Sequence, residues 1–242
     1  MQRPRLAFLH GFMGHPSDWD EVRDTIGQSC DTYALEVQPA DDWASCLRQL
    51  AVSIPEHSIL VGYSMGARLA LGLAIEFSSN FSGLVLISGS PGLETQEARD
   101  LRWLADQKVA SQIESQPRRD FLTGWYRQSV FDTVPEHIVT SVIKRKLKQN
   151  SQHWPAILKT LSVAKQPNYW ERVDELAIPA LAVAGEQDEK YKRIALRLQD
   201  AADNIEAKVI ANCGHLVHRE QPSNLAKAIG NFLGRKIPDQ VE

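Results

Sequence analysis

A serine, a carboxylate and a histidine follow one another along the chain in positions that suit chemistry at a seryl oxygen. Residues 62–66 read Gly-Tyr-Ser-Met-Gly, a G-x-S-x-G pattern centred on Ser64, between a predicted strand and a predicted helix. Asp188 ends a Gly-Glu-Gln-Asp stretch, and His215 ends an Asn-Cys-Gly-His stretch. A serine hydroxyl is only weakly acidic, so it needs a base, and that base needs an orienting carboxylate. The sequence therefore predicts that His215 takes the proton of Ser64 and that Asp188 orients His215.

Each of these positions also has a simpler interpretation. Ser64 and Asp188 are alternatively caps of the helices that follow them. Glu186, two residues before Asp188, competes with it as the orienting acid. His218 is an alternative base, and its simpler role is that of a supporting, hydrogen-bonding histidine beside Glu220.

A glycine-rich turn near the N-terminus adds a second element of the predicted site. Residues 9–14 read Leu-His-Gly-Phe-Met-Gly, directly after an apolar strand. Such a turn can aim the backbone N–H of Phe12 at a developing oxyanion, with the N–H of Met65 as the second donor. The alternative is that His10 and Gly11 only end the strand.

The elements that must position these residues alternate between strands and helices. Continuous apolar strands separated by helices indicate a parallel sheet covered on both faces, that is, an α/β fold. The carboxyl edge of such a sheet is where open α/β folds place their sites. The predicted strands span 6–10, 32–37, 58–63, 83–88, 179–185 and 206–210, and the predicted helices span 17–27, 43–52, 66–77, 190–201 and 223–233.

The alternation is interrupted by a helical stretch. Residues 92–172 are rich in Arg, Lys, Gln and Trp and contain no convincing buried strand. We therefore expect a core built from 1–91 and 173–242, with 92–172 inserted as a helical lid in a single catalytic unit. The insertion holds 13 Lys and Arg against 9 Asp and Glu, a balance of +4, which leaves −7 for the rest of the chain.

Composition excludes several classes of protein. The 242 residues carry 27 Lys and Arg and 30 Asp and Glu, for a net charge of −3, and 43% of them are hydrophobic, so we expect one large core. The sequence contains no sustained basic stripe, so a nucleic-acid partner is disfavoured. It contains neither a membrane span nor an apolar signal segment in residues 1–5, so a cytoplasmic location is expected. The three cysteines, Cys30, Cys46 and Cys213, have no metal-ligand spacing and are expected to be free thiols. The pattern indicates no metal and no organic cofactor.

Several motifs together resemble a known family. The chain is similar over its whole length to the α/β-hydrolase superfamily, and within it to the 2-succinyl-6-hydroxy-2,4-cyclohexadiene-1-carboxylate synthase (MenH) family. The motifs that carry this resemblance are LHGFMG at 9–14 with Asp-Trp at 18–19, GYSMGAR at 62–68, GEQDEKY at 185–191 and GHLVHREQP at 214–222. In the insertion, they are SPGL at 90–93, Arg99, Arg102, Asp106, Trp-Tyr at 125–126, Gln-Pro at 166–167 and Trp170.

The resemblance implies an α/β-hydrolase fold with an inserted helical lid and a lyase reaction in menaquinone or phylloquinone biosynthesis. The implied substrate, 2-succinyl-5-enolpyruvyl-6-hydroxy-3-cyclohexene-1-carboxylate, loses pyruvate by proton abstraction and elimination. Ser64, activated by His215 and Asp188, is then the base, and the Phe12 and Met65 amides hold the anionic intermediate. The expected partner is this small polycarboxylate, with neither nucleic acid nor stable membrane insertion.

A substrate with several carboxylates needs matching cations, and guanidinium groups bind carboxylates through two parallel hydrogen bonds. The resemblance implies a substrate-binding arginine at Arg68, one helical turn after Ser64. In the insertion we expect Arg102 as the second cation, with Arg99 as the alternative.

A third cation and two aromatic residues complete the predicted site. Lys146 stands where the family usually has an arginine, beside Arg145, and a solvated helix face is an equal interpretation of this charged run. Tyr63 and Trp125 either line the pocket or belong to the core.

Two other functions fit the same fold. One is a carboxylesterase or thioesterase that uses Ser64 as a nucleophile, although an arginine-rich insertion disfavours an apolar acyl pocket. The other is a hydrolase-like small-molecule binding protein without turnover, which the apparent triad disfavours. The sequence leaves the oligomeric state open.

Overall fold

Six parallel strands form one sheet at the centre of the molecule. The computed structural model describes residues 3–236, so positions 1–2 and 237–242, the outermost residues of the predicted core, lie outside the description. The strand order is β2-β1-β3-β4-β5-β6, and every pairing in it is parallel. The strands are β1 (Arg5–Leu9), β2 (Asp31–Leu35), β3 (Ser58–Tyr63), β4 (Phe81–Ile87), β5 (Ala180–Gly185) and β6 (Ile205–Ile210).

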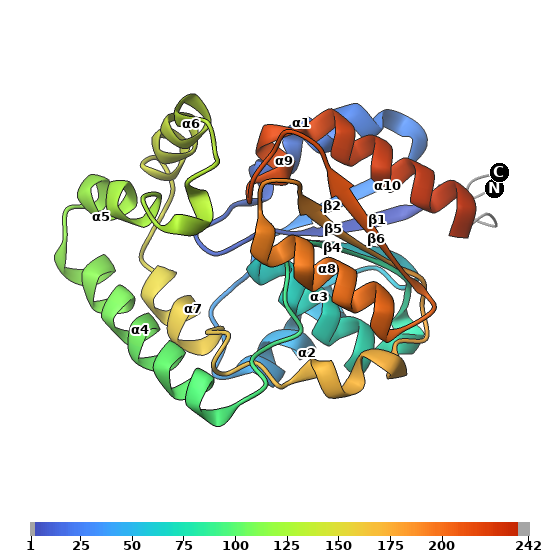
Figure 1. Ribbon diagram of the computed structural model, residues 1–242, viewed down its shortest axis with the longest axis horizontal. Helices are drawn as coiled ribbons and strands as arrows, with labels where there is room; N and C mark the ends of the chain where they lie inside the picture. Colours follow the sequence, from blue (N-terminus) through green and yellow to red (C-terminus); the bar gives the residue numbers. More distant parts are fainter. Residues whose placement is uncertain (1–2, 237–242) are drawn as a thin grey trace.

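Helices cover both faces of the sheet, as Figure 1 shows. One face carries α1 (Asp20–Ile26), α9 (Val217–Glu220) and α10 (Pro222–Lys236), and the other carries α2 (Trp43–Ser53), α3 (Met65–Glu76) and α8 (Glu189–Ala201). Alternate residues of a strand enter opposite cores: Leu6 and Phe8 of β1 pack toward α1 and α10, and Ala7 and Leu9 pack toward α2 and α3. The predicted α/β class is confirmed.

The chain between β4 and β5 contains helices and no strand among the residues that the structure describes. Its main helices are α4 (Gln96–Ser115), α5 (Arg118–Trp125), α6 (Glu136–Lys146) and α7 (Trp154–Thr160), which lie together on one side of the molecule (Figure 1). Short 3-10 helices occur at Pro16–Trp19, Gly27–Ser29, Ser78–Asn80, Ser129–Phe131 and Tyr169–Glu175.

Several element boundaries differ from the predicted ones for local reasons. The second strand ends at Leu35 because the N–H of Val37 donates to His10 Nε2, not to a neighbouring strand. The first capping box is centred on His15, with Asp18 as its reciprocal partner, because Pro16 starts the helical turn earlier than expected. The last helix continues through Gly234, where the sequence suggests that it ends.

Three observations on the described residues 3–236 complement the sequence. No helix there is long and apolar enough to cross a membrane. No cluster of three or more His, Cys, Asp or Glu side chains there could hold a metal ion. Cys30, Cys46 and Cys213 are buried free thiols, as expected.

Candidate active site

Ser64 lies on a sharp turn between β3 and α3, in a backbone conformation that few non-glycine residues adopt. Its φ and ψ are 52° and −108°. A Cβ on Gly62 would lie 2.3 Å from the carbonyl oxygen of Gly66, and one on Gly66 would lie 2.1 Å from that of Leu9. Both flanking glycines are therefore required for the chain to turn this tightly. The Ser64 side chain makes no capping hydrogen bond to α3, so its alternative role as a helix cap is not observed.

Asp188 holds His215 and caps a helix at the same time. Asp188 Oδ2 lies 2.6 Å from His215 Nδ1, and Oδ1 accepts from the N–H of Tyr191 at 3.2 Å, at the start of α8. Because a carboxylate only accepts, Nδ1 carries the proton, and Nε2 is left as the acceptor. Glu186 is exposed and accepts from the N–H of Asn212, so this competing acid does not reach His215.

Glu220 fixes the loop that carries His215. Its two carboxylate oxygens accept from the N–H groups of Gly214 and Leu216, both at 2.9 Å, so they bracket the histidine. Ser88 Oγ donates to the His215 carbonyl oxygen at 3.3 Å. The imidazole is thus restrained through its own backbone as well as through Asp188.

Ser64 and His215 line a common cavity of about 230 Å³. Among the described residues, no hydrogen bond joins Ser64 to His215, and such contacts commonly tighten only when a substrate is bound. A second cavity of about 280 Å³ adjoins the first one. The two cavities share Phe12, Ser64, Arg102, Trp125, Lys190 and Tyr191.

The glycine-rich turn lies against Ser64. A Cβ on Gly11 would lie 3.5 Å from Ser64 Cβ, and the turn is closed by a hydrogen bond from Gly14 N–H to the Gly11 carbonyl oxygen at 2.9 Å. Within residues 3–236, neither the Phe12 nor the Met65 N–H donates to a protein acceptor. Two amides beside a seryl oxygen are therefore available to an anion.

The His10 side chain forms a hydrogen bond with this turn. Its Nε2 accepts from the N–H of Val37 at 3.1 Å, so Nδ1 carries the proton and donates to the Gly11 carbonyl oxygen at 2.8 Å. Burial lowers the pKa of His10, which keeps the ring neutral and this pair of hydrogen bonds intact.

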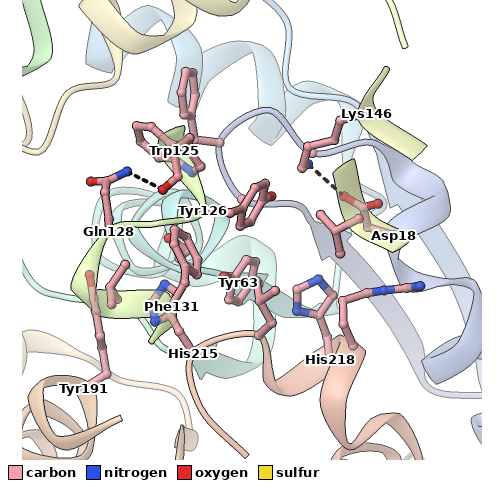
Figure 2. Close-up of a pocket in the computed structure, with 18 of the residues that line it drawn as sticks. Asp18, Tyr63, Trp125, Tyr126, Gln128, Phe131, Lys146, Tyr191, His215 and His218 are labelled. Atoms are coloured by element: carbon pink, nitrogen blue, oxygen red, sulfur yellow. Dashed lines mark hydrogen bonds and ion pairs between the residues drawn. The ribbon is translucent and has the colours of Figure 1, made fainter. Parts of the chain in front are cut away.

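His218 differs from its expected role. It makes no hydrogen bond with Glu220, whose oxygens bind backbone amides instead, and its buried Nδ1 has no partner within the described chain. Its ring packs against that of Tyr63 at a centroid distance of 4.2 Å and an interplanar angle of 44°, and Figure 2 shows Tyr63 between the two histidines. Burial lowers the pKa of His218 to about 3, so the ring is neutral near pH 7. The carboxylate of Asp188 binds His215 and not His218.

Arg68 is partly buried and connects α3 to the insertion. Its guanidinium donates to the Leu161 carbonyl oxygen at 2.8 Å and to Gln166 Oε1 at 3.2 Å, and it lies over the Trp43 ring. Burial, and then the charge of Arg102, lower the pKa of Arg68 to about 10, so the side chain is still a cation near pH 7. Arg68 lines the second cavity.

Arg102, rather than Arg99, reaches the site. Arg102 lines both cavities, and its Nε donates to Asp106 Oδ1 at 2.8 Å. The buried Asp106 also accepts from Ser162 Oγ at 2.6 Å. Arg99 donates to the carbonyl oxygens of Ala164 and Gln166 and lines neither cavity.

Of the remaining predicted residues, the two aromatic ones line a cavity, whereas the two cations bind backbone carbonyl oxygens. Tyr63 and Trp125 line the first cavity. Lys146 also borders it, but its Nζ donates to the Met13 carbonyl oxygen at 2.6 Å. Arg145 donates to the Ser17 carbonyl oxygen at 2.7 Å and lines neither cavity.

Four further residues were not assigned a role from the sequence. Lys190 and Tyr191 line both cavities, Glu220 holds the His215 loop, and Asp106 holds Arg102. All four lie inside or between the motifs of the resemblance, but their positions in the sequence do not show which of them face the cavities and which hold a neighbouring residue.

The chain is similar to known proteins in sequence and in fold. The chain matches a family model described as Alpha/beta hydrolase family over residues 6–228. It is 30% identical to the 2-succinyl-6-hydroxy-2,4-cyclohexadiene-1-carboxylate synthase of Salmonella typhimurium (strain LT2), over 95% of this chain and 94% of that protein. It is similar to the solved structure of MenH from S. aureus, with a TM-score of 0.90, 25% identity and coverage of 98% and 96% of the two chains. An esterase from Thermogutta terrifontis, with 18% identity, a TM-score of 0.74 and coverage of 97% and 90%, shares the fold.

Proposed function

Because this chain belongs to the alpha/beta hydrolase family and, within it, to the 2-succinyl-6-hydroxy-2,4-cyclohexadiene-1-carboxylate synthases, we propose that it eliminates pyruvate from 2-succinyl-5-enolpyruvyl-6-hydroxy-3-cyclohexene-1-carboxylate. This step belongs to menaquinone or phylloquinone biosynthesis. The observation that supports it best is that Ser64 borders two adjoining cavities, with His215, which Asp188 holds, at the first cavity, Arg68 at the second and Arg102 at both.

Ser64, His215 and Asp188 act together as the base. His215 Nε2 takes the hydroxyl proton of Ser64, and the seryl oxygen takes a carbon-bound proton from the substrate. The electron pair left on carbon forms the new C=C bond while the C–O bond to the enolpyruvyl group breaks. The departing enolate takes up a proton and becomes pyruvate, so neither an acyl-enzyme nor a hydrolytic water is needed.

Two backbone amides stabilise the charge that develops. Proton abstraction next to a carbonyl group places negative charge on its oxygen, and N–H donors aimed at that oxygen lower the barrier. The Phe12 and Met65 amides supply these donors, and their freedom from protein acceptors within residues 3–236 supports this role.

Arg68 and Arg102 bind the substrate carboxylates. Arg68 faces the second cavity, and Arg102 lies where the two cavities meet, so a polycarboxylate spanning both would contact two cations. Tyr63 and Trp125 provide the apolar walls against the ring. Residues 92–172 act as a lid, because Arg102 and Trp125 belong to that insertion and Ser64 belongs to the core.

Pyruvate release tests the proposal directly. The purified protein is given the enolpyruvyl substrate, and pyruvate is followed by its NADH-dependent reduction with lactate dehydrogenase. Simple p-nitrophenyl esters are tested in parallel. We expect rapid pyruvate release that exceeds ester turnover. Ester hydrolysis without pyruvate release would support a carboxylesterase or thioesterase instead, and the absence of both would support a binding protein.

A further inference from the structure

Lys146 makes an unusual contact for a cation at the edge of a carboxylate-binding cavity. Its side chain, only 5% exposed, donates from Nζ to the Met13 carbonyl oxygen at 2.6 Å. Asp18 Oδ2, 4.0 Å from the same Nζ, supplies a counter-charge (Figure 2). Burial alone would raise the pKa of Asp18, but the charges of Lys146 and other neighbours outweigh it and hold the pKa below its usual value. The positive charge of Lys146 is therefore balanced from within the protein.

The carbonyl group that Lys146 binds belongs to a peptide unit of the turn beside Ser64. The same Met13–Gly14 peptide donates its N–H to the Gly11 carbonyl oxygen at 2.9 Å. Lys146 thus holds one end of this peptide, and Gly11 holds the other. Met13 has a φ of 58°, a conformation that non-glycine residues rarely adopt, so outside contacts must hold the turn in place.

Phe12, whose N–H is a proposed oxyanion donor, lies between these two anchored points. The insertion contacts it a second time, because the rings of Trp125 and Phe12 meet edge to face at 5.5 Å. Arg145, next to Lys146, also binds the Ser17 carbonyl oxygen of the same core segment. The C-terminal ends of α5 and α6 therefore both contact the core segment that carries the Phe12 amide.

We propose that Lys146 is a positioning residue that orients the Phe12 N–H through the Met13 peptide and does not serve as a carboxylate-binding cation. This rests on the proposed function, since it assumes that the Phe12 amide stabilises an oxyanion. It replaces the role predicted for Lys146 from the sequence. It also makes the insertion part of the machinery that stabilises charge, not only a source of substrate-binding cations.

The two roles of Lys146 predict different kinetics. Loss of a carboxylate-binding cation weakens substrate binding and raises KM. Loss of a group that orients an oxyanion donor removes stabilisation of the transition state and lowers kcat. Removal of one such donor costs about 10²–10³-fold in kcat, so its misplacement is expected to cost about 10–10²-fold.

Lys146→Met provides the test because it keeps the length and apolar stem of the side chain and removes the donor. We expect kcat for pyruvate release to fall about 10–10²-fold, with KM within about threefold of wild type. Lys144→Met, at an exposed position on the same helix, is the matched control and should behave like wild type. A large rise in KM with an unchanged kcat would overturn the proposal.

A double variant and a neutral probe make the test independent of folding and of the substrate. Lys146→Met combined with Asp18→Asn also removes the carboxylate that loses its counter-charge in the single variant, so it should keep the kcat defect of that variant. A kcat restored to wild type would overturn the proposal.

Diisopropyl fluorophosphate, which carries no carboxylate, phosphorylates serines that have an oxyanion hole. Mass spectrometry should show slower modification of Ser64 in Lys146→Met than in the Lys144→Met control. Equal rates would overturn the inference. Failure of the proposed function is distinguishable, because wild type would then release no pyruvate.

Discussion

Asp188 reaches His215 with one carboxylate oxygen and the first turn of α8 with the other. The distance from Oδ2 to His215 Nδ1 is 2.6 Å, and Oδ1 accepts from the N–H of Tyr191 at 3.2 Å. Capping α8 and contacting His215 are alternative interpretations of Asp188 in the sequence, and in the structure this residue makes both contacts. Capping fixes the carboxylate in the orientation that the histidine needs, so local helix structure contributes directly to the geometry of the site.

Asp188→Asn should separate these two roles. An asparagine can still cap α8 through its oxygen, so the free energy of unfolding should change by less than about 1 kcal/mol. It cannot hold the imidazolium that forms when Ser64 loses its proton, so kcat for pyruvate release should fall about 10²–10⁴-fold. Urea unfolding and steady-state kinetics measure the two effects. Glu186→Gln is the control and should retain wild-type activity; a comparable loss in that variant would make Glu186 the working acid.

Ser64→Ala removes the proposed base and should lower pyruvate release at least about 10²-fold. The protein should remain folded, because the Ser64 side chain makes no capping hydrogen bond. Circular dichroism checks the fold, and the coupled lactate dehydrogenase assay gives the rate. Ser53→Ala, on the exposed surface of α2, is the control. Near-wild-type pyruvate release by Ser64→Ala would show that this serine is not the base.

Arg102→Lys tests carboxylate binding with little disturbance of the fold. The lysine keeps a positive charge near the buried Asp106 but loses the planar fork that binds a carboxylate through two hydrogen bonds. Hydrogen bonds to charged groups contribute about 1.5–3 kcal/mol, so KM should rise about 10-fold or more. Arg48→Lys, exposed on α2, should leave KM unchanged. If both variants had the wild-type KM, Arg102 would not bind substrate.

A substitution of Arg68 is expected to change the stability of the fold as well as substrate binding. Its guanidinium binds the Leu161 carbonyl oxygen and Gln166 from the core side, so Arg68→Met would leave two acceptors unpaired. Each acceptor that stays buried costs about 1–3 kcal/mol, so this variant should lose stability as well as substrate binding. Thermal unfolding should therefore accompany any kinetic measurement on it.

Because of His218, we expect the protein to lose stability in acid. An unperturbed histidine has a pKa of 6.5, and burial, which disfavours the charged ring, lowers the pKa of His218 to about 3 in the folded protein. Between these values the unfolded chain binds the proton and the folded protein does not. The free energy of unfolding therefore falls as pH falls through that window, by up to about 1.4 kcal/mol per pH unit for this residue. His10, whose pKa burial also lowers, acts in the same direction.

The variant His218→Phe keeps an aromatic ring on Tyr63 and removes the titrating group. Urea unfolding at several values between pH 7 and pH 4 should show a flatter decline for this variant than for wild type. Parallel declines would mean that His218 is not a source of the acid sensitivity.

The features that the sequence predicts correctly are those written into neighbouring residues. Continuous apolar runs identify the six strands, and Gly62 and Gly66 mark the turn at Ser64 because a side chain at either position would meet backbone atoms. In a parallel sheet every strand ends at the same edge, so the positions of Ser64, Asp188 and His215 after three different strands already place them at one edge of the sheet. The pairing of Asp188 with His215 and the fold class follow from local patterns of this kind.

The partners of the long polar side chains are decided by tertiary structure alone. Nothing near Lys146 or Arg145 in the chain indicates that their side chains meet the carbonyl oxygens of Met13 and Ser17. A long flexible side chain reaches many positions, and the one it occupies depends on which distant backbone groups are buried beside it and need a partner. The sequence by itself thus determined the fold and placed Ser64, Asp188 and His215 at one edge of the sheet, whereas the packing of the insertion against the core decided which contacts its charged side chains make.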